Sequence, residues 1–441
     1  MINLKVRVFF FILAIATHAC NPSQNRAKSN SNVSDSSSAT NALNLPEPNA
    51  TKSVMNFSKV IGWPKGKTPV APAGFKVELF ADSLISPRWI YVCPNGDVLV
   101  AEANTELSGL KKIGAKLLGI TKAQRFDQSA NRITLFRDTD KDGTADFRKV
   151  FLSGLNQPLG MLIIRNTFYV ANTDGLWKYP YQNGQTEIKL AGVKILALPA
   201  GGYNNHWTRN IITNSDSSKI YISVGSGSNV GENGMEHEVR RANILEVNLD
   251  GSGEIIYASG LRNSVGMGFA PGTSTLWAAV NERDELGDDL VPDYFTSVVK
   301  NGFYGWPYSY FGQNIDARIE NTKPELVKKA IIPDVALGAH TASLGLAFYD
   351  QKVFPKKYHN GAFIGQHGSW NRSEISGYKV VFVPFSGGKP SGKPEDFLTG
   401  FVSDKQNEEV YGRPVGVTVL GDGSILVADD ASHIIWRISV K

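Results

Sequence analysis

Cysteine is scarce in this chain. Only two of its 441 residues are cysteines, Cys20 and Cys93. Cys93 ends an apolar strand pattern at residues 89–93, where we expect a small buried side chain. A single cysteine in the body of the chain excludes a disulfide framework, a cysteine-based zinc site and a thiol mechanism.

Basic clusters and long apolar runs are also missing. The formal net charge is +5, spread along the chain without a run of lysine or arginine, which argues against a nucleic-acid partner. The apolar run at residues 8–16 is too short to cross a membrane. It follows Lys5 and Arg7, which is the pattern of a secretory signal peptide.

The residues after this run indicate export. Thr17-His18-Ala19-Cys20 resembles a bacterial lipoprotein cleavage site, and cleavage of a plain signal peptide is the alternative. We expect a signal peptide at residues 1–20, a flexible Ser- and Asn-rich tether at residues 21–70 and one folded domain at residues 71–441. The predicted location is the cell envelope or periplasm, with a lipid on Cys20 as the membrane contact.

Six segments of the chain repeat one pattern, a polar pair followed by two apolar strands around a turn. They are residues 87–104, 158–174, 208–229, 264–284, 343–372 and 414–430. One four-stranded sheet per segment, with loop insertions, accounts for their spacing. We therefore predict an all-β fold, a six-bladed β-propeller of four-stranded antiparallel sheets.

Polar residues gather at one end of these hairpins. In an antiparallel pair, the residue before the first strand and the residue after the second lie at the same end. Those before the first strands are Arg88, Gln157, His206 with Arg209, Arg262 with Asn263, His340 and Arg413. Those after the second strands are Glu102, Asn172, Asn229, Asp284, His367 and Asp430. If the first strands line the axis, these groups surround one mouth of the channel.

The arginines among them favour an anionic ligand. Arg88, Arg209, Arg262 and Arg413 stand at the start of four different segments, or directly before it, but are predicted to approach the same mouth. Guanidinium groups bind carboxylates bidentately, so a polycarboxylate fits better than a neutral ligand. The alternative is that each arginine pairs with a neighbouring acid, such as Asp429, Asp430, Glu102 or Asp284.

Two histidines are candidates for a catalytic base. His206 directly precedes a strand, and an imidazole near neutrality accepts a proton from a hydroxyl. His367, in the stretch Gly365-Gln366-His367-Gly368, is the rival base and a candidate ligand contact. A structural, hydrogen-bonded role is the alternative for each of them.

Two motifs resemble those of a known family. Residues 259–266, SGLRNSVG, are similar to the Arg-Asn motif of the quinoprotein glucose and sorbosone dehydrogenases. Residues 301–307, NGFYGWP, are similar to their Asn-Tyr-Gly-Trp-Pro segment. The likeness extends from about Gly74 to the C-terminus and is strongest to the sorbosone-dehydrogenase-like branch.

The resemblance implies a function. It implies a six-bladed propeller that holds pyrroloquinoline quinone (PQQ) and a Ca²⁺ ion at the channel mouth and oxidises an aldose or a sugar aldehyde. Hydride would pass to the quinone, and the electrons to an envelope acceptor such as a cytochrome or a quinone.

The resemblance also implies roles for individual residues. His206 would be the base and Arg262 would stabilise the developing charge, while the backbone of Glu282 and Arg283 would approach the Ca²⁺ ion. The cofactor-binding residues would be Arg209, Asn229, Arg262, Asn263, His367 and Arg413. The sequence departs from the family at Asn205, which occupies the position of the base when counted back from Arg209, at Val415 in place of an arginine, and at Gln366-His367 in place of a lysine.

A second metal-like signal lies at residues 138–146, DTDKDGTAD. Asp138, Asp140, Asp142 and Asp146 are candidate ligands of a structural Ca²⁺ ion, because alternating carboxylates followed by glycine place several oxygens around a hard cation. An Asp-rich hairpin turn is the alternative. Lys149 stands where the usual twelfth-position acid would be.

Two other functions remain open from the sequence. A calcium-dependent, lactonase-type propeller hydrolase would carry carboxylates and Asn on a central metal and few arginines. A non-catalytic propeller that binds glycans or proteins would use Trp207, Trp306 and Trp370 as a contact surface.

Overall fold

The computed structural model describes residues 44–106 and 129–441. Residues 45–441 form one compact unit. The predicted signal peptide at residues 1–20, Cys20 and the tether up to residue 43 lie outside the described residues. In the part of the chain that is described, no helix is long and apolar enough to span a membrane.

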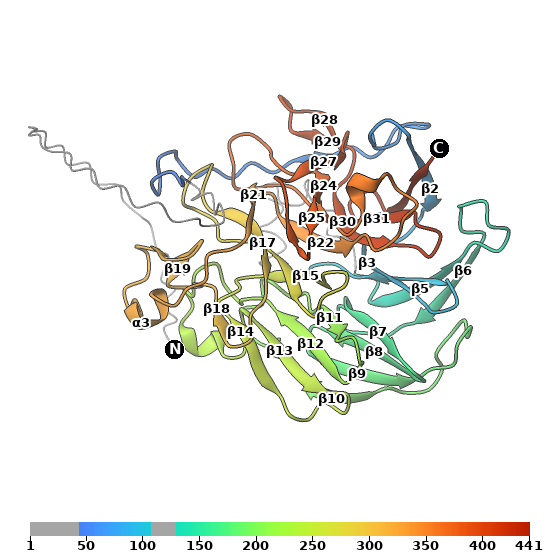
Figure 1. The fold of residues 1–441 in the computed structure, drawn as a ribbon, viewed down its shortest axis with the longest axis horizontal. Helices are drawn as coiled ribbons and strands as arrows, with labels where there is room; N and C mark the ends of the chain where they lie inside the picture. Colours follow the sequence, from blue (N-terminus) through green and yellow to red (C-terminus); the bar gives the residue numbers. More distant parts are fainter. Residues whose placement is uncertain (1–43, 107–128) are drawn as a thin grey trace, which may run out of the picture. The chain divides into compact units, whose positions relative to one another are not determined.

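Six sheets of at least four strands make up this unit (Figure 1). Sheet one contains β3 (Pro87–Val92), β4 (Val98–Glu102), β5 (Arg132–Arg137) and β6 (Phe147–Leu152). Sheet two contains β7 (Met161–Ile164), β8 (Thr167–Asn172), β9 (Gly175–Pro180) and β10 (Val193–Ala197). Sheet three contains β11 (Ile211–Thr213), β12 (Lys219–Val224), β13 (Asn243–Asn248), β14 (Ile255–Ser259) and β18 (Gly302–Phe303).

The other three sheets follow in chain order. Sheet four contains β15 (Ser264–Phe269), β16 (Leu276–Val280), β17 (Pro292–Ser297) and β21 (Val335–Ala339). Sheet five contains β22 (Ser343–Phe348), β23 (Ala362–Gln366), β24 (Lys379–Val383) and β27 (Glu395–Leu398). Sheet six contains β30 (Pro414–Val419), β31 (Ile425–Asp429), β32 (Ile434–Val440) and β2 (Phe75–Ala81). The prediction of an all-β fold of four-stranded antiparallel sheets is confirmed, except that β18 adds a parallel fifth strand to sheet three.

Short elements decorate the sheets. They are β1 (Lys59–Val60), β19 (Ser309–Tyr310), β20 (Asn314–Ile315), β25 (Phe385–Ser386), β26 (Lys389–Pro390), β28 (Val402–Asp404), β29 (Glu409–Val410), the α-helix α3 (Pro324–Val327) and the 3₁₀ turns η1 (Met235–Glu238) and η2 (Lys356–Tyr358).

The first strands of neighbouring sheets pack backbone against backbone. Glycine makes this possible, since a Cβ on Gly345 of β22 would lie 2.0 Å from the Val415 carbonyl oxygen of β30. A Cβ on Gly416 of β30 would likewise lie 2.6 Å from the Arg88 carbonyl oxygen of β3. The glycine that recurs in the repeated segments therefore serves close approach of strands.

Apolar residues cover both faces of the sheets. Every residue of β4, β16, β23 and β31 is buried, because the two faces of each strand belong to different buried apolar clusters. These strands read as continuous apolar runs rather than alternating ones for the same reason. Val265, Leu344 and Val415, from three different first strands, meet in one buried cluster.

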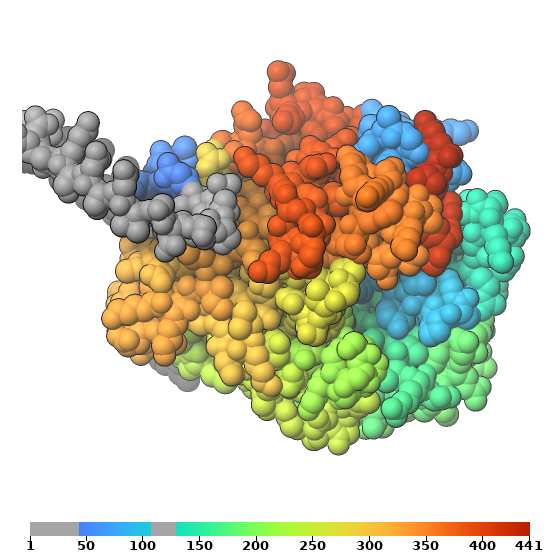
Figure 2. Space-filling view, in the orientation of Figure 1, coloured from blue at the N-terminus to red at the C-terminus, as the bar shows by residue number. Residues whose placement is uncertain are grey.

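The two ends of the compact unit are joined within sheet six. β2, near the N-terminus, pairs antiparallel with the C-terminal strand β32. Figure 2 shows the dark-red C-terminal residues against blue residues of β2. Such pairing ties the N-terminal part of the unit to its last sheet.

The compact unit begins earlier than expected. Residues 45–70 were predicted to belong to the flexible tether, but they lie within the compact unit. β1 pairs in parallel with β29, and the Trp63 indole packs against Phe401 and Trp436. Trp63, near the end of this segment, is half-buried by this packing. The domain boundary is therefore near residue 45 rather than 71.

Candidate active-site pocket

A pocket of about 860 Å³ opens at the end of the hairpins where polar residues were expected to gather. The strand register confirms the hairpin geometry, since Pro87 pairs with Glu102 and Pro414 pairs with Asp429. The charged and polar lining residues include Arg88, His206, Asn229, Glu232, Arg262, Asn263, Asn281, Asp284, Arg318, His367 and Arg413. Val265 and Leu344, from the first strands of two sheets, add apolar surface.

His206 presents one ring nitrogen as a base. Its Nδ1 lies 2.9 Å from the carbonyl oxygen of Ser226 and 2.9 Å from Ser226 Oγ. Ser226 Oγ donates its own hydrogen to the Ser228 carbonyl, so both groups facing Nδ1 act as acceptors. The proton of the neutral ring therefore lies on Nδ1, and Nε2 carries a lone pair. Burial, with the nearby charge of Arg262, lowers the pKa of His206 to about 3, so the ring is neutral at pH 7.

Arg262 is fully engaged within the protein. Its Nε donates to the Asn229 carbonyl at 3.1 Å, and one terminal nitrogen donates to Asn229 Oδ1 at 2.8 Å and lies 3.3 Å from Asp284 Oδ2. The other terminal nitrogen donates to Asn281 Oδ1 at 3.1 Å and to the Glu282 carbonyl at 2.6 Å. The side chain thus lends positive charge to the pocket while it fixes residues from two neighbouring sheets.

Asp284 links Arg262 to His340. Its Oδ1 lies 3.2 Å from His340 Nδ1, and His340 Nε2 lies 2.9 Å from the Gly287 carbonyl. Burial opposes ionisation, but the His340 hydrogen bond and the Arg262 charge together lower the pKa of Asp284. The pocket wall that contains His206 and Arg262 therefore includes the ionised carboxylate of Asp284.

The hydrogen bonds around His367 involve a different carboxylate, that of Asp430. His367 Nε2 lies 2.8 Å from Asp430 Oδ1, and the other oxygen of Asp430 lies 2.5 Å from Arg88 NH1. Burial alone would raise the pKa of Asp430, but His367 and Arg88 outweigh it and lower that pKa. Burial, and then the charge of Arg413, lower the pKa of His367 to about 4. His367 thus has Nε2 held by a carboxylate, as His206 has Nδ1 held by Ser226, and both histidines line the pocket.

Arg413 supports the His367 loop. Its Nε donates to the His367 carbonyl at 2.9 Å and one terminal nitrogen donates to the Gly368 carbonyl at 2.8 Å. The guanidinium also lies over the Tyr378 ring, 5.4 Å from its centroid. Of the four arginines expected at the mouth, Arg88, Arg262 and Arg413 line the pocket. Two of them pair with acids, as the alternative proposed.

Arg209 has a different place from the one expected. It is fully buried behind the lining residues, where its terminal nitrogens donate to the carbonyls of His206 and Pro199, each at 2.7 Å. Arg209 is three residues after His206 in the chain. Its side chain does not line the pocket and binds the backbone of the loop that carries His206. Arg209 therefore stabilises the loop that carries His206 and does not face the space where a cofactor would bind.

The segment expected near calcium is occupied by protein contacts. The Glu282 carbonyl accepts the hydrogen bond from Arg262 already described. Arg283 is fully buried, with Nε 2.9 Å from Glu282 Oε2 and NH1 3.1 Å from Asp316 Oδ2. Neither residue lines the pocket, whereas Asn281 and Asp284 on either side of them do.

Arg318 and Phe57 are among the lining residues that the repeats did not indicate. Arg318 donates to the Asp284 carbonyl at 2.8 Å and to Asp316 Oδ1 at 2.9 Å. It comes from the insertion that carries β19 and β20, outside all six repeated segments. Phe57 comes from the segment predicted to be a tether. The one signal in the sequence is that Phe57 is an aromatic residue in a Ser- and Asn-rich stretch, and such a residue is a candidate for packing against the domain.

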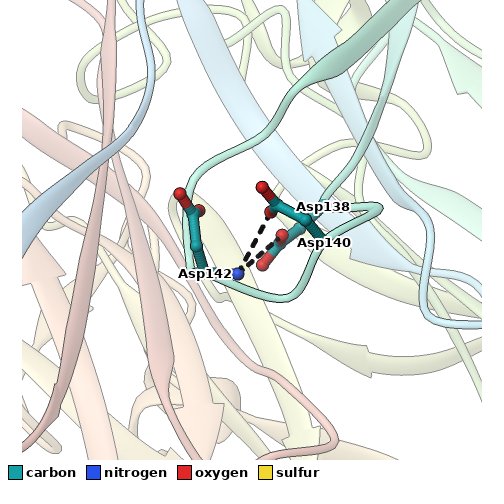
Figure 3. A group of neighbouring side chains, drawn as sticks. All are labelled: Asp138, Asp140 and Asp142. Carbon is teal, nitrogen blue, oxygen red and sulfur yellow. Dashed lines mark hydrogen bonds between the residues drawn. The ribbon is translucent and has the colours of Figure 1, made fainter.

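The Asp-rich loop lies away from the pocket. It connects β5 to β6, and β5 pairs with β4 so that Arg132 is opposite Glu102 at the pocket end and Phe136 is opposite Val98 at the other end. Asp138, Asp140 and Asp142 bring carboxylate oxygens within 4.8 Å of one another (Figure 3). Asp146 points elsewhere and accepts the Thr139 backbone N–H at 2.9 Å. Three of the four predicted ligands thus come together.

Comparison with known proteins identifies the family. A model of TrAA12-like proteins matches residues 69–294 and 311–441. The chain belongs to the TrAA12-like family. An uncharacterized protein of Borreliella burgdorferi is 30% identical to this member over 381 residues, which cover 83% of this chain and 89% of that protein.

Two solved structures share the TrAA12-like fold. The holo form of the PQQ domain of pyranose dehydrogenase from Coprinopsis cinerea has a TM-score of 0.68 and 19% identity, covering 87% of this chain and 100% of that one. The calcium structure of the family AA12 carbohydrate-active enzyme of Trichoderma reesei has a TM-score of 0.68 and 18% identity, covering 91% and 100%. Together with the family match, these likenesses confirm the resemblance to PQQ-dependent sugar dehydrogenases.

Proposed function

We propose that this protein is a PQQ- and Ca²⁺-dependent dehydrogenase that oxidises an aldose or a related sugar aldehyde. The observation that carries the proposal is His206, a neutral histidine whose Nε2 lone pair is left for the pocket while Nδ1 is held by Ser226. A base of this kind, next to a cluster of arginines, suits removal of a hydroxyl proton beside an anionic cofactor.

We further propose that the six sheets close into a six-bladed propeller. The contacts between first strands run from sheet to sheet around the pocket. The Ile163 backbone N–H of β7 donates to Tyr91 Oη of β3 at 3.0 Å, which links sheets one and two. A closed ring leaves no exposed sheet edge on its inner side.

The pocket fits the cofactor in charge and in hydrogen bonding. PQQ carries three carboxylates, and Arg88, Arg262, Arg318 and Arg413 all line the pocket. Asn263 Oδ1 is buried and has no hydrogen-bond partner among the described residues. Such an oxygen needs a donor or a cation from a ligand, since an unsatisfied buried acceptor costs about 1–3 kcal/mol.

PQQ supplies the hydride acceptor when it is bound. His206 Nε2 would take the proton of the substrate hydroxyl, while the Ser226 carbonyl stabilises the imidazolium through Nδ1. Arg262 would stabilise negative charge that develops in the pocket. An anion bound nearby also favours the imidazolium, so ligand binding raises the pKa of His206 from its low value toward neutrality.

The proposal includes an envelope location. The chain would be exported, anchored by a lipid on Cys20, and would pass its electrons to a cytochrome or a quinone of the envelope. Mass analysis of the N-terminal peptide from the native membrane fraction tests this part, because a lipidated Cys20 and a plain cleaved terminus differ in mass.

Reconstitution tests the activity. Adding PQQ and Ca²⁺ to the purified cofactor-free protein should shift the absorption spectrum of PQQ and produce dye reduction that depends on an aldose. Binding of PQQ without sugar-dependent reduction would favour a non-catalytic sugar-binding propeller. Absence of PQQ binding, with lactone hydrolysis that depends on Ca²⁺, would favour the hydrolase.

A further inference from the structure

Residues 45–63, here called the strap, lie outside the matched family segments, which begin at residue 69. The strap is nonetheless fastened to the sheets at both ends. At its start, the Asn49 N–H donates to the Leu286 carbonyl at 2.8 Å. At its end, β1 pairs with β29 and Trp63 Nε1 donates to the buried Asp429 Oδ2 at 2.8 Å.

Between these ends the strap joins two loops at the pocket. On the loop after β16, the Gly287 N–H donates to Ser53 Oγ at 2.9 Å and the Asp288 N–H donates to Thr51 Oγ1 at 2.7 Å. On the loop after β23, Asn371 Nδ2 donates to the Val54 carbonyl at 2.9 Å.

The two loops are also joined to each other beneath the strap. The Glu285 N–H donates to Asn371 Oδ1 at 2.7 Å, and the Asn56 N–H of the strap donates to the Trp370 carbonyl at 2.7 Å. Specific backbone bonds of this kind hold the middle of the strap in one position. A segment fixed in this way presents its side chains as part of the pocket wall.

Phe57 is the strap residue that reaches the pocket. Its ring is stacked on Trp370, with the centroids 5.8 Å apart and the planes inclined by 6°. Both side chains are half-buried and both line the pocket. The strap thereby completes an uncharged aromatic surface in a pocket whose other walls are rich in arginine and carboxylate.

We infer that Phe57 and Trp370 form the surface on which the substrate's sugar ring packs, and that the strap is a specificity element added to the family fold. A pyranose has an apolar C–H face and hydroxyl groups at its edge. Aromatic rings bind the former, whereas the arginine-rich walls suit anions. This inference rests on the proposed function and names the wall that selects its substrate.

Replacement of Phe57 tests the inference in the PQQ-loaded full-length protein. Phe57→Leu keeps an apolar side chain but removes the ring, and Phe57→Tyr keeps the ring. Met55→Ala is the matched control, because Met55 belongs to the strap, is 61% exposed and does not line the pocket. KM, kcat and the PQQ titration curve are measured for each variant.

A second readout is independent of turnover. A 1,5-anhydro sugar lacks the anomeric hydroxyl and cannot be oxidised there, so calorimetric titration with it reports binding alone. Phe57→Leu should raise both KM and the dissociation constant of the analogue about 2- to 12-fold, the scale of one aromatic contact, with kcat and PQQ affinity unchanged. Met55→Ala should match the wild type, and Phe57→Tyr, which keeps the ring, should raise both constants less than Phe57→Leu does.

The outcomes separate the two proposals. Wild-type protein without PQQ-dependent turnover would refute the proposed function itself. An active wild type with unchanged KM and analogue binding in Phe57→Leu would refute the strap inference alone, as would weaker PQQ binding in place of weaker sugar binding. If Phe57→Leu folds poorly, Thr51→Ala is the second variant, because it removes a hydrogen bond of the strap and leaves the Phe57 ring in place. Thr51→Ala should also raise KM. An unchanged KM in this variant would refute the inference.

Discussion

Two histidines, His206 and His367, line the pocket, and different groups hold their rings. On the His206 wall, Nδ1 meets a carbonyl and a hydroxyl oxygen, and Nε2 is left for a ligand. On the His367 wall, Nε2 itself faces the carboxylate of Asp430, which Arg88 also holds. The residue type is the same, but a carbonyl and a hydroxyl hold one ring whereas a carboxylate holds the other, and we predict that His206 is the base.

The sharpest test of this contrast exchanges the two histidines for alanine. His206→Ala should retain PQQ and lose about 10²- to 10⁴-fold in kcat, the scale of general-base catalysis. His367→Ala should keep most of its turnover per folded molecule but lose stability, because Asp430 loses a buried partner. Steady-state kinetics and melting temperatures check both. If turnover is lost in His367→Ala while His206→Ala stays active, the two roles are reversed.

Arg262 tests whether the His206 wall binds the anion. Arg262→Ala should weaken PQQ binding by about 1.5–3 kcal/mol, the scale of a charge-assisted interaction, because the pocket loses a positive charge; spectroscopic titration measures it. Arg240→Ala is the control, since Arg240 pairs with Glu254 at 2.7 Å and does not line the pocket. An unchanged titration curve for Arg262→Ala would remove the charge argument for this wall.

The Asp-rich loop extends the comparison to the other end of sheet one. We predict that Ca²⁺ at Asp138, Asp140 and Asp142 stabilises the fold by about 2.7 kcal/mol at a hundredfold excess over its dissociation constant. Asp140→Asn with Asp142→Asn should abolish the rise in melting temperature on adding Ca²⁺ and leave turnover intact. Asp146→Asn, whose carboxylate contacts Thr139, should keep that response. Loss of turnover at an unchanged melting temperature would contradict the placement of this site away from the pocket.

The smallest effect concerns pH. The pKa of His206 is lowered to about 3 in the folded state, whereas an unfolded histidine titrates at about 6.5. The unfolded chain therefore binds more protons as pH falls below about 6.5, and this residue's contribution to stability is lost on the way to its folded-state pKa. His206→Gln should show a smaller drop in melting temperature between pH 6.5 and 4 than the wild type.

The comparison with the wild type is needed because other groups act in the opposite direction. Burial raises the pKa of Asp293 and of Asp429 to about 6, and their contributions to stability are lost as pH rises through that value. These terms are shared by both proteins and cancel in the difference. Identical pH profiles for the two proteins would show that His206 is not buried as a neutral ring.

Much of the fold and part of the site could be predicted from local pattern. Repeated pairs of apolar strands around a turn marked the hairpins, and antiparallel pairing then placed Arg88, His206, Arg262, His367 and Arg413 at one end. Arg209 defeats that reasoning, because it is three residues from His206 and yet points behind the wall. Pattern places a backbone at one end of a sheet but does not say where each side chain points.

The sequence by itself determined the all-β class, the recurring glycines that let first strands approach, and the set of polar groups at one end of the hairpins. Only the tertiary structure decided which of those groups remain available. Ser226, which holds His206, is 20 residues away in the chain, and Asp430, which engages His367, is 63 residues away. The strap shows the same limit, since Phe57 meets Trp370 across most of the chain. Hydrogen bonds and ring contacts depend on atoms brought together by folding, and local sequence carries no record of distant partners.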